Sequence, residues 1–153
     1  MEIKRLTKAS DEDAFLFSSI AKAAKAHWGY PKEWLSLWDA DLSFNTEFLN
    51  ANHVFVISVK DQTIGFCVII EEKQFFTIEH CWILPEQIGH GYGKQLLRYA
   101  LSQPLFQNQT FNVLSDPNAV GFYQKFGFKT IKMIPGTPKG RELPLMQMTN
   151  TER

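Results

Sequence analysis

The sequence predicts an α+β protein in which one mixed β-sheet is flanked by helices. Its 153 residues are 44% hydrophobic and 14% aromatic, so the chain is long enough for one buried core and too short for two ordinary domains. Strand patterns with short turns occupy the middle and the end of the chain, and helical patterns lie between them. Within residues 75–101, a strand pattern changes into a helix pattern across a run of glycines. We therefore expect a single domain over residues 1–153.

The start of the chain predicts one strand and two helices. Residues 2–7 have a short strand pattern. Ser10 precedes three acidic residues and predicts the start of a helix that reaches about Ala26, because a hydroxyl caps free N–H groups and acids oppose the positive end of the helix dipole. Pro31 suits a first helical turn, and the helical spacing that follows predicts a second helix over residues 31–42.

The middle of the chain predicts three strands. Residues 53–59 and 63–70 are separated by a hairpin-length turn. Residues 75–84 follow another short turn and are apolar on both faces, which is typical of a buried strand. Three consecutive strands with short turns predict an antiparallel meander.

The last third of the chain predicts a return to the same sheet. Residues 110–114 form a strand pattern, and a helix separates them from the strand at 75–84, which favours parallel pairing of the two strands. Residues 117–126 predict a helix. Residues 128–134 and 142–149 predict a final hairpin.

Three alternate glycines, Gly89, Gly91 and Gly93, occupy the loop and the first turn of the helix that follows the 75–84 strand. Glycine costs a helix about 1 kcal/mol relative to alanine, so three of them indicate that something approaches the backbone closely. Free N–H groups and the helix dipole favour a phosphate at that position, and Lys94 would add positive charge. A flexible connection without a ligand is the alternative. We call residues 89–94 the glycine loop.

Two motifs carry a resemblance to a known family. The run Ile88-Gly89-His90-Gly91-Tyr92-Gly93 resembles motif A of the GNAT superfamily, the N-acetyltransferases that use acetyl-CoA. Gly91 and Gly93 match the two glycines of that motif, while Ile88 stands where the family has Gln or Arg. The run from Asp116 to Phe128 resembles the family's motif B, Asn-x-x-Ala-x-x-Phe-Tyr-x-x-x-Gly-Phe, with Asp in place of the first Asn.

The resemblance covers roughly residues 55–148 and implies the GNAT acyl-CoA N-acyltransferase fold, with acetyl-CoA as co-substrate and no metal. It implies that the glycine loop holds the CoA pyrophosphate through backbone N–H groups and that the backbone of the central strand pairs with the pantetheine arm. The implied cofactor-binding residues are Trp82, Ile83, Ile88, Gly89, His90, Gly91, Tyr92, Gly93, Lys94, Asp116 and Asn118.

Acetyl transfer to an amine requires a base for the amine and a proton for the departing thiolate. Tyr123 falls on the family's general-acid tyrosine, which implies that it protonates the CoA sulfur; packing on an amphipathic helix is the alternative. Glu79 or His80, polar residues inside the buried strand, would accept the amine proton. Neighbouring residues of a strand point to opposite faces unless a bulge intervenes, so we expect at most one of them to face the acceptor.

Aromatic residues gather around the start of the second helix. Trp28, Tyr30 and Trp34 are our candidates for binding the acceptor, because pockets are lined mainly by apolar and aromatic groups. Packing of the helix against the sheet would explain the same residues.

The composition of the chain limits which classes of binding partner we expect. Sixteen Lys and Arg balance sixteen Asp and Glu, so we expect neither nucleic acid nor a membrane as a partner. No apolar run approaches the roughly 20 residues that span a bilayer, and we recognise no signal peptide, so we expect a cytoplasmic protein. The two cysteines and four histidines are too scattered for a metal site. A homodimer stays open.

The function predicted first is transfer of an acetyl group from acetyl-CoA directly to a primary amine of a small molecule. A protein or peptide N-acetyltransferase is one alternative, which would need an open groove in place of the aromatic-rich start of the chain. A catalytically silent acyl-CoA binding module is the other, and Ile88 at the first motif position keeps it open.

Overall fold

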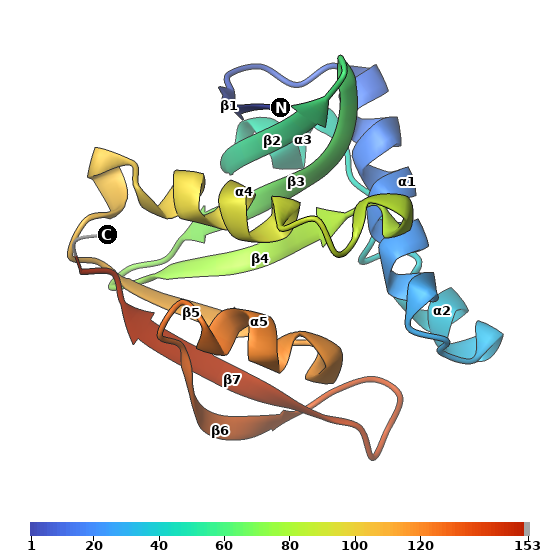
Figure 1. The fold of residues 1–153 in the computed structure, drawn as a ribbon. Coiled ribbons are helices and arrows are strands. Elements are labelled where there is room, and N and C mark those ends of the chain that lie inside the picture. The colour runs from blue at the N-terminus through green and yellow to red at the C-terminus, as the bar shows by residue number, and fades with distance from the viewer. Residues whose placement is uncertain (152–153) are drawn as a thin grey trace.

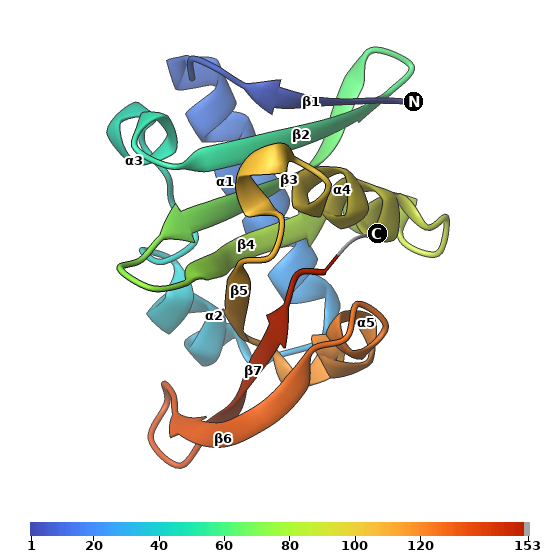
Figure 2. The ribbon, with the colours of Figure 1, turned by 90° about the vertical axis from the view of Figure 1, so that its left-hand side faces the viewer.

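The computed structural model describes residues 1–151 and contains a seven-stranded sheet of order β1-β2-β3-β4-β5-β7-β6. Figure 2 shows the strands side by side in this order. They are β1 (Glu2–Leu6), β2 (His53–Val59), β3 (Gln62–Glu71), β4 (Phe76–Ile83), β5 (Thr110–Leu114), β6 (Lys129–Pro135) and β7 (Glu142–Thr149). The β2-β3-β4 meander and the final hairpin are antiparallel, and β4 pairs with β5 in parallel. The predicted mixed sheet is confirmed.

Five α-helices and three 3-10 turns connect the strands. The helices are α1 (Asp11–His27), α2 (Lys32–Trp38), α3 (Thr46–Asn50), α4 (Tyr92–Leu101) and α5 (Val120–Gln124). The turns are η1 (Pro85–Gln87), η2 (Pro104–Phe106) and η3 (Pro117–Ala119). Ser10 caps α1 through a reciprocal pair of hydrogen bonds with Asp13, as the acidic first turn predicted. None of the helices described is long and apolar enough to cross a membrane.

Three predicted helix boundaries are wrong. The helix after the glycines, whose helical spacing predicts a start near Gly89, begins at Tyr92, because Gly91 at its N-cap has a left-handed φ of 77°. The second helix ends at Trp38, and the chain continues as a turn in which Leu42 N–H donates to the Trp38 carbonyl. The helix predicted over 117–126 is divided into η3 and α5, because Ala119 has φ −106° and ψ 0°, outside the helical region.

A hydrophobic core lies on each face of the sheet. On one face, α4 buries an apolar stripe completely: Leu96, Leu97, Ala100 and Leu101. On the other face, α1, α2 and α3 bury Phe17, Ile20, Trp38 and Leu49 among their side chains. Each fully buried Leu, Ile or Phe contributes about 1.5–3 kcal/mol. The two cores fix the helices on opposite faces of β4.

β4 and β5 pair over only two residue pairs, Phe76 with Phe111 and Thr77 with Asn112. Immediately after these pairs β4 contains a β-bulge: Ile78 lies opposite Ile69 and His80 opposite Val68, so Glu79 has no partner on β3. A bulge bends its strand and increases the local twist. Figure 1 shows β4 and β5 meeting at one end and diverging toward the other. The divergence leaves the β5-facing edge of β4 unpaired beyond Thr77.

Gly65 brings β3 and the end of β4 into close approach. It lies opposite Ile83, and a Cβ atom at this position would be 2.4 Å from Ile83 Cδ1 and 2.7 Å from the Trp82 carbonyl oxygen. Real Cβ atoms do not approach other atoms this closely. Gly65 therefore sets the position of the diverging end of β4.

Candidate active site

A cavity of about 540 Å³ occupies the gap between β4 and β5. Its wall comes from β4 after the bulge, the glycine loop, the end of β5, α5 and the C-terminal end of α1. Residues predicted for cofactor binding, for catalysis and for the acceptor all contribute to this wall, among them Gly91, Tyr123, Glu79 and Trp28.

Free backbone donors surround one part of the cavity. In the part of the chain that the structure describes, the N–H groups of the six residues from Gly89 to Lys94 donate to no acceptor, whereas Gln95 N–H closes the first turn of α4 onto the Gly91 carbonyl. Gly89 and Gly91 have left-handed φ values of 93° and 77°, which only glycine adopts at little cost. All of these residues except His90 line the cavity. The loop is therefore a cluster of unpaired donors at a helix start, as an anion requires.

At Gly93, the space in the cavity and not the backbone conformation favours glycine. Its φ is not left-handed, but a Cβ atom there would lie 3.4 Å from Phe122 Cε1 and 3.5 Å from Ile83 Cγ1, both of which line the cavity. A larger side chain at Gly93 would enter the cavity.

Tyr123 presents a protonated hydroxyl to the cavity. Its side chain is buried on α5 and lies on the cavity wall. Within residues 1–151 its hydroxyl has no hydrogen-bond partner, and since no buried side-chain oxygen there lacks one, the hydroxyl has accessible surface. Burial raises the pKa of the Tyr123 phenol well above its ordinary value, and the neighbouring Cys81 and Cys67 thiols add to the rise. The phenol is thus a proton donor at neutral pH.

The β4 bulge brings Glu79 and His80 to the same cavity. Ile78 packs in the α4-side core, whereas the His80 ring lies 4.7 Å from the Phe44 ring on the α1 side, so the alternation of faces is broken between them. Both Glu79 and His80 line the cavity. The bulge inserts one residue into the alternation, as the exception in the prediction allowed, and which of the two faces the acceptor stays a prediction.

The two side chains differ as bases. Burial lowers the pKa of His80 to about 4, and its Nδ1 accepts a hydrogen bond from Trp82 Nε1 at 3.0 Å, so the ring is neutral with its proton on Nε2. Burial raises the pKa of the Glu79 carboxyl, and the negative charges of Glu72 and Asp41 add to the rise. A carboxylate with a raised pKa is the better proton acceptor of the two.

The three aromatic acceptor candidates occupy different positions. Trp28 is 41% exposed and lines the cavity. Tyr30 stacks on Trp34 at 5.9 Å and meets Trp38 edge-on at 5.0 Å, and neither Tyr30 nor Trp34 lines the cavity. Trp34 packs against the α1-side core, which agrees with the packing alternative.

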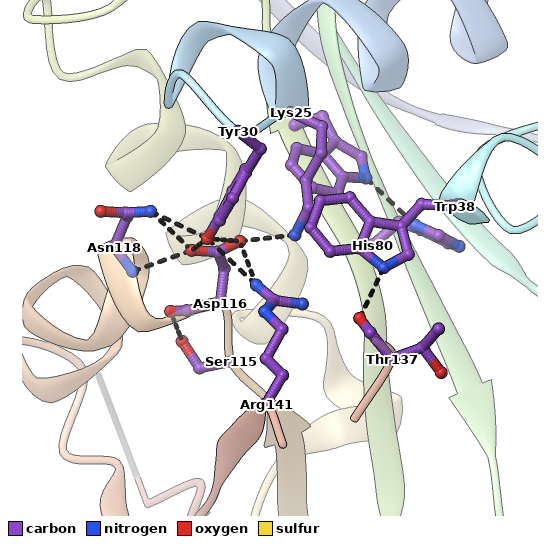
Figure 3. A network of polar contacts seen from close by, with 10 residues as sticks. Lys25, Tyr30, Trp38, His80, Ser115, Asp116, Asn118, Thr137 and Arg141 are labelled. Carbon is purple, nitrogen blue, oxygen red and sulfur yellow. Dashed lines mark hydrogen bonds and ion pairs between the residues drawn. The ribbon is translucent and has the colours of Figure 1, made fainter. Parts of the chain in front are cut away.

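A polar network that the sequence analysis missed lies beside the cavity, and its members come from α1, α2 and the segments around β5 and β7 (Figure 3). We call it the Asp116 network; it consists of Lys25, Tyr30, Trp38, Asp116, Asn118 and Arg141. Asp116 Oδ2 accepts from Lys25 Nζ at 2.5 Å and from the Tyr30 hydroxyl at 3.0 Å, and it lies 3.4 Å from Arg141 Nη2. The backbone N–H of Asn118 donates to Asp116 Oδ1 at 2.8 Å.

The network joins residues that the sequence assigned to different sites. Asp116 and Asn118 were predicted to bind the cofactor and Tyr30 the acceptor, and here they bond to one another. Lys25 and Arg141 were not predicted, because they lie 91 and 25 residues from Asp116 in the chain. The acid at position 116, where the resembled motif has an amide, was the one signal of a cationic partner.

Charge and aromatic contacts hold the network together. Burial opposes ionisation of Asp116, but the hydrogen bond from Lys25 and the Asn118 backbone N–H outweigh it, so the pKa of Asp116 is lowered. Lys25 Nζ lies 4.4 Å and the Arg141 guanidinium carbon 4.5 Å from the centre of the Trp38 ring, within cation–π range. Trp38 Nε1 donates to the Thr137 carbonyl at 2.8 Å. In residues 1–151, no three His, Cys, Asp or Glu side chains are placed to hold a metal ion.

Comparisons with known proteins agree with this geometry. Residues 50–130 match a family model described as an acetyltransferase (GNAT) domain. The chain is 31% identical over 93 residues to the peptidyl-lysine N-acetyltransferase YjaB of Salmonella typhimurium, and this match spans 60% of each chain.

Solved structures share the fold. The PaiA N-acetyltransferase of Thermoplasma acidophilum, in complex with coenzyme A, has a TM-score of 0.72 at 20% identity, over 97% of this chain and 99% of its own. The ribosomal-protein-S18-alanine N-acetyltransferase of Escherichia coli has a TM-score of 0.67 at 14% identity, over 99% and 96% of the two chains. From the family match over more than half of its length, the chain belongs to the GNAT family of acetyltransferases.

Proposed function

We propose that this protein is an acetyl-CoA-dependent N-acetyltransferase that transfers the acetyl group directly to a primary amine of a small molecule. One observation carries the proposal: a single cavity joins the free N–H groups of the glycine loop to the unpartnered hydroxyl of Tyr123 and to Glu79. An anion-binding end, a proton donor and a base in one cavity are the groups that this reaction needs.

The residues of the cavity fit CoA. The N–H groups of the glycine loop and the Lys94 ammonium would hold the pyrophosphate, even though Ile88 offers it no polar side chain. The unpaired edge of β4 at Trp82 and Ile83 would accept the amide groups of the pantetheine arm as an added strand does. Acetyl-CoA supplies the acetyl group as an activated thioester. Asp116 and Asn118 would border the arm, since both line the cavity.

In this proposal the catalytic groups have separate roles. Tyr123 donates its proton to the departing sulfur, because its raised pKa keeps it protonated. Glu79 accepts the amine proton, directly or through water. His80 stays neutral and accepts a hydrogen bond from Trp82, so it helps to position the acceptor and does not act as the base.

The name of the Salmonella relative favours the second candidate, a peptidyl-lysine acetyltransferase. Two contacts favour a small acceptor: Trp38 donates to Thr137 and Arg141 donates to Tyr30, so α2 is bound to the loop between β6 and β7. This link restricts the open groove that a peptide needs.

A thiol-release assay with acetyl-CoA tests the proposal. Amino acids, polyamines, aminoglycosides, arylamines and lysine-containing peptides serve as acceptors, and Tyr123→Phe is the control for enzymatic release. Turnover with a small amine is the expected result. Turnover with peptides alone would establish the second candidate, and CoA binding without turnover on any acceptor would leave a silent binding module.

A further inference from the structure

Two buried cations share one carboxylate in the Asp116 network. The side chains of Lys25, Asp116 and Arg141 are 11%, 9% and 10% exposed. In residues 1–151, neither Lys25 nor Arg141 has an ion pair with any other acid. Buried charges are stable when they are paired, so the network has an excess of one positive charge.

The excess charge belongs to Arg141. Lys25 Nζ contacts Asp116 at 2.5 Å, whereas Arg141 Nη2 lies 3.4 Å from the same oxygen, at the outer limit of a hydrogen bond. The positive charge of Arg141 also contributes to the lowered pKa of Lys25, after burial. The two cations thus repel each other, and a second anion would relieve the repulsion.

Arg141 keeps free donors. Nη2 donates to the Tyr30 hydroxyl and to Asp116, whereas Nε and Nη1 have no partner among the described residues. Since no buried side-chain nitrogen or oxygen there lacks a partner, these donors have accessible surface. Figure 3 shows the second terminal nitrogen on the side away from Asp116. One face of the guanidinium is near Trp38, so an incoming group meets its edge.

The network adjoins the acceptor side of the cavity. Lys25 and Asp116 line the cavity, and Lys25 Nζ lies 6.0 Å from the centre of the Trp82 ring, whose Nε1 bonds to His80. Lys25, Trp38 and Trp82 lie on the α1-side of the sheet, whereas α4, which begins at the glycine loop, covers the other side. Arg141 itself does not line the cavity, but it bonds to Asp116, which does, and its network lies on the side of the sheet away from α4 and the glycine loop.

Building on the proposed acetyltransferase function, we propose that Arg141 binds a carboxylate of the acceptor, so that the substrates are amino acids or other small amines that carry a carboxylate. A planar guanidinium edge matches a carboxylate through two parallel hydrogen bonds. Such an acceptor has opposite charges at its ends: its carboxylate pairs with Arg141, and its amine faces the Glu79 carboxylate.

The test compares each amino acid with its carboxamide, which has the same amine and no negative charge. With acetyl-CoA saturating, the parent should show kcat/KM roughly 10- to 100-fold higher for the amino acid, the range expected for a charge-assisted hydrogen bond. Arg141→Gln should remove this preference by raising the KM of the amino acid alone. Lys139→Gln, which removes an exposed charge from the same loop, should leave the preference unchanged.

Two results would overturn the proposal: equal kcat/KM for acid and amide in the parent, or an equal loss for both in Arg141→Gln, which would make Arg141 a structural link. If Arg141→Gln does not fold, Arg141→Lys replaces it in the test. Lysine keeps the positive charge but lacks the planar guanidinium edge, so Arg141→Lys should reduce the preference for the amino acid.

A binding measurement separates this proposal from the proposed function. Calorimetry with N-acetylated amino acids and their amides reports the carboxylate site without turnover. Binding of the acid form that depends on Arg141, in a protein that acetylates no amine, would support the carboxylate site and refute the enzyme. Turnover of uncharged amines, with no preference for the acid, would do the opposite.

Discussion

The glycine loop and the Asp116 network border the same cavity and are built in opposite ways. The loop presents backbone N–H groups, and it needs glycines because side chains there would strain the backbone or enter the cavity. The network offers charged and aromatic side chains from segments far apart in the sequence, and each depends on its neighbours.

The difference explains what each site tolerates. If the glycine loop binds the CoA pyrophosphate as proposed, it should accept a change such as Ile88 at the first motif position, because the backbone donors do not come from that side chain. If the Asp116 network binds the acceptor as proposed, a change of one residue there should alter acceptor specificity without altering cofactor binding.

The largest effect should come from Tyr123→Phe, which removes the proposed proton donor from the cavity that both regions border. A general acid contributes about 10²–10⁴-fold, so kcat should fall by that factor while the Kd for acetyl-CoA stays near the parent value. Stopped-flow or steady-state thiol release measures the first quantity and calorimetry the second. Tyr99→Phe, an exposed tyrosine on α4, is the matched control. Parent-like turnover in Tyr123→Phe would remove this residue from the mechanism.

Glu79→Gln tests the base. The pKa of Glu79 is raised above its ordinary value of 4.5, and a base must be deprotonated, so activity should be present above that raised pKa and be lost as pH falls through it. The Gln variant should be slower by about 10²-fold and should lack this acid limb. A pH profile of kcat/KM shows both. If the acid limb persists in Glu79→Gln, another group is the base.

Gly93→Val tests the backbone site. Because the added side chain enters the cavity beside Phe122 and Ile83, the Kd for CoA should rise by more than about 10-fold, the loss of one or two charge-assisted hydrogen bonds. In Gly121→Ala, the added Cβ meets no atom within 4 Å, and the Kd should not change. Equal calorimetric affinities for CoA in Gly93→Val and the parent would exclude the phosphate-binding role of the loop.

The smallest effect should be that of Gly65→Ala on stability. The new Cβ would overlap the Trp82 carbonyl and Ile83, and overpacking of this kind costs about 1–3 kcal/mol. Urea unfolding measures the free energy of unfolding, and the Kd for CoA should rise with it because the cavity edge of β4 shifts. An unchanged free energy of unfolding would show that β4 yields without strain.

Local patterns predicted most of the fold. The strand patterns and the Ser10 cap depend on residues close in sequence, and they appear where they were expected. The bulge at Glu79 depends on how β3 and β4 pair, so the sequence left its position open.

The candidate site divides in the same way. The glycine loop is one continuous motif and was predictable. The Asp116 network is assembled by tertiary packing, and nothing near Lys25 or Arg141 in the sequence indicates their partner.

The short pairing of β4 with β5 leaves a weakly joined boundary within the sheet, which we call the seam. Only two residue pairs join the strands β1–β4 to the strands β5–β7, and the Asp116 network and the Trp38–Thr137 bond span the same boundary from the helical side. Without ligand, the amides of β4 on the β5-facing edge after Thr77 lack a partner strand, so they should exchange with deuterium faster than those bonded to β3. A pantetheine arm in the gap would join the two halves of the sheet, and CoA should slow this exchange along the whole seam.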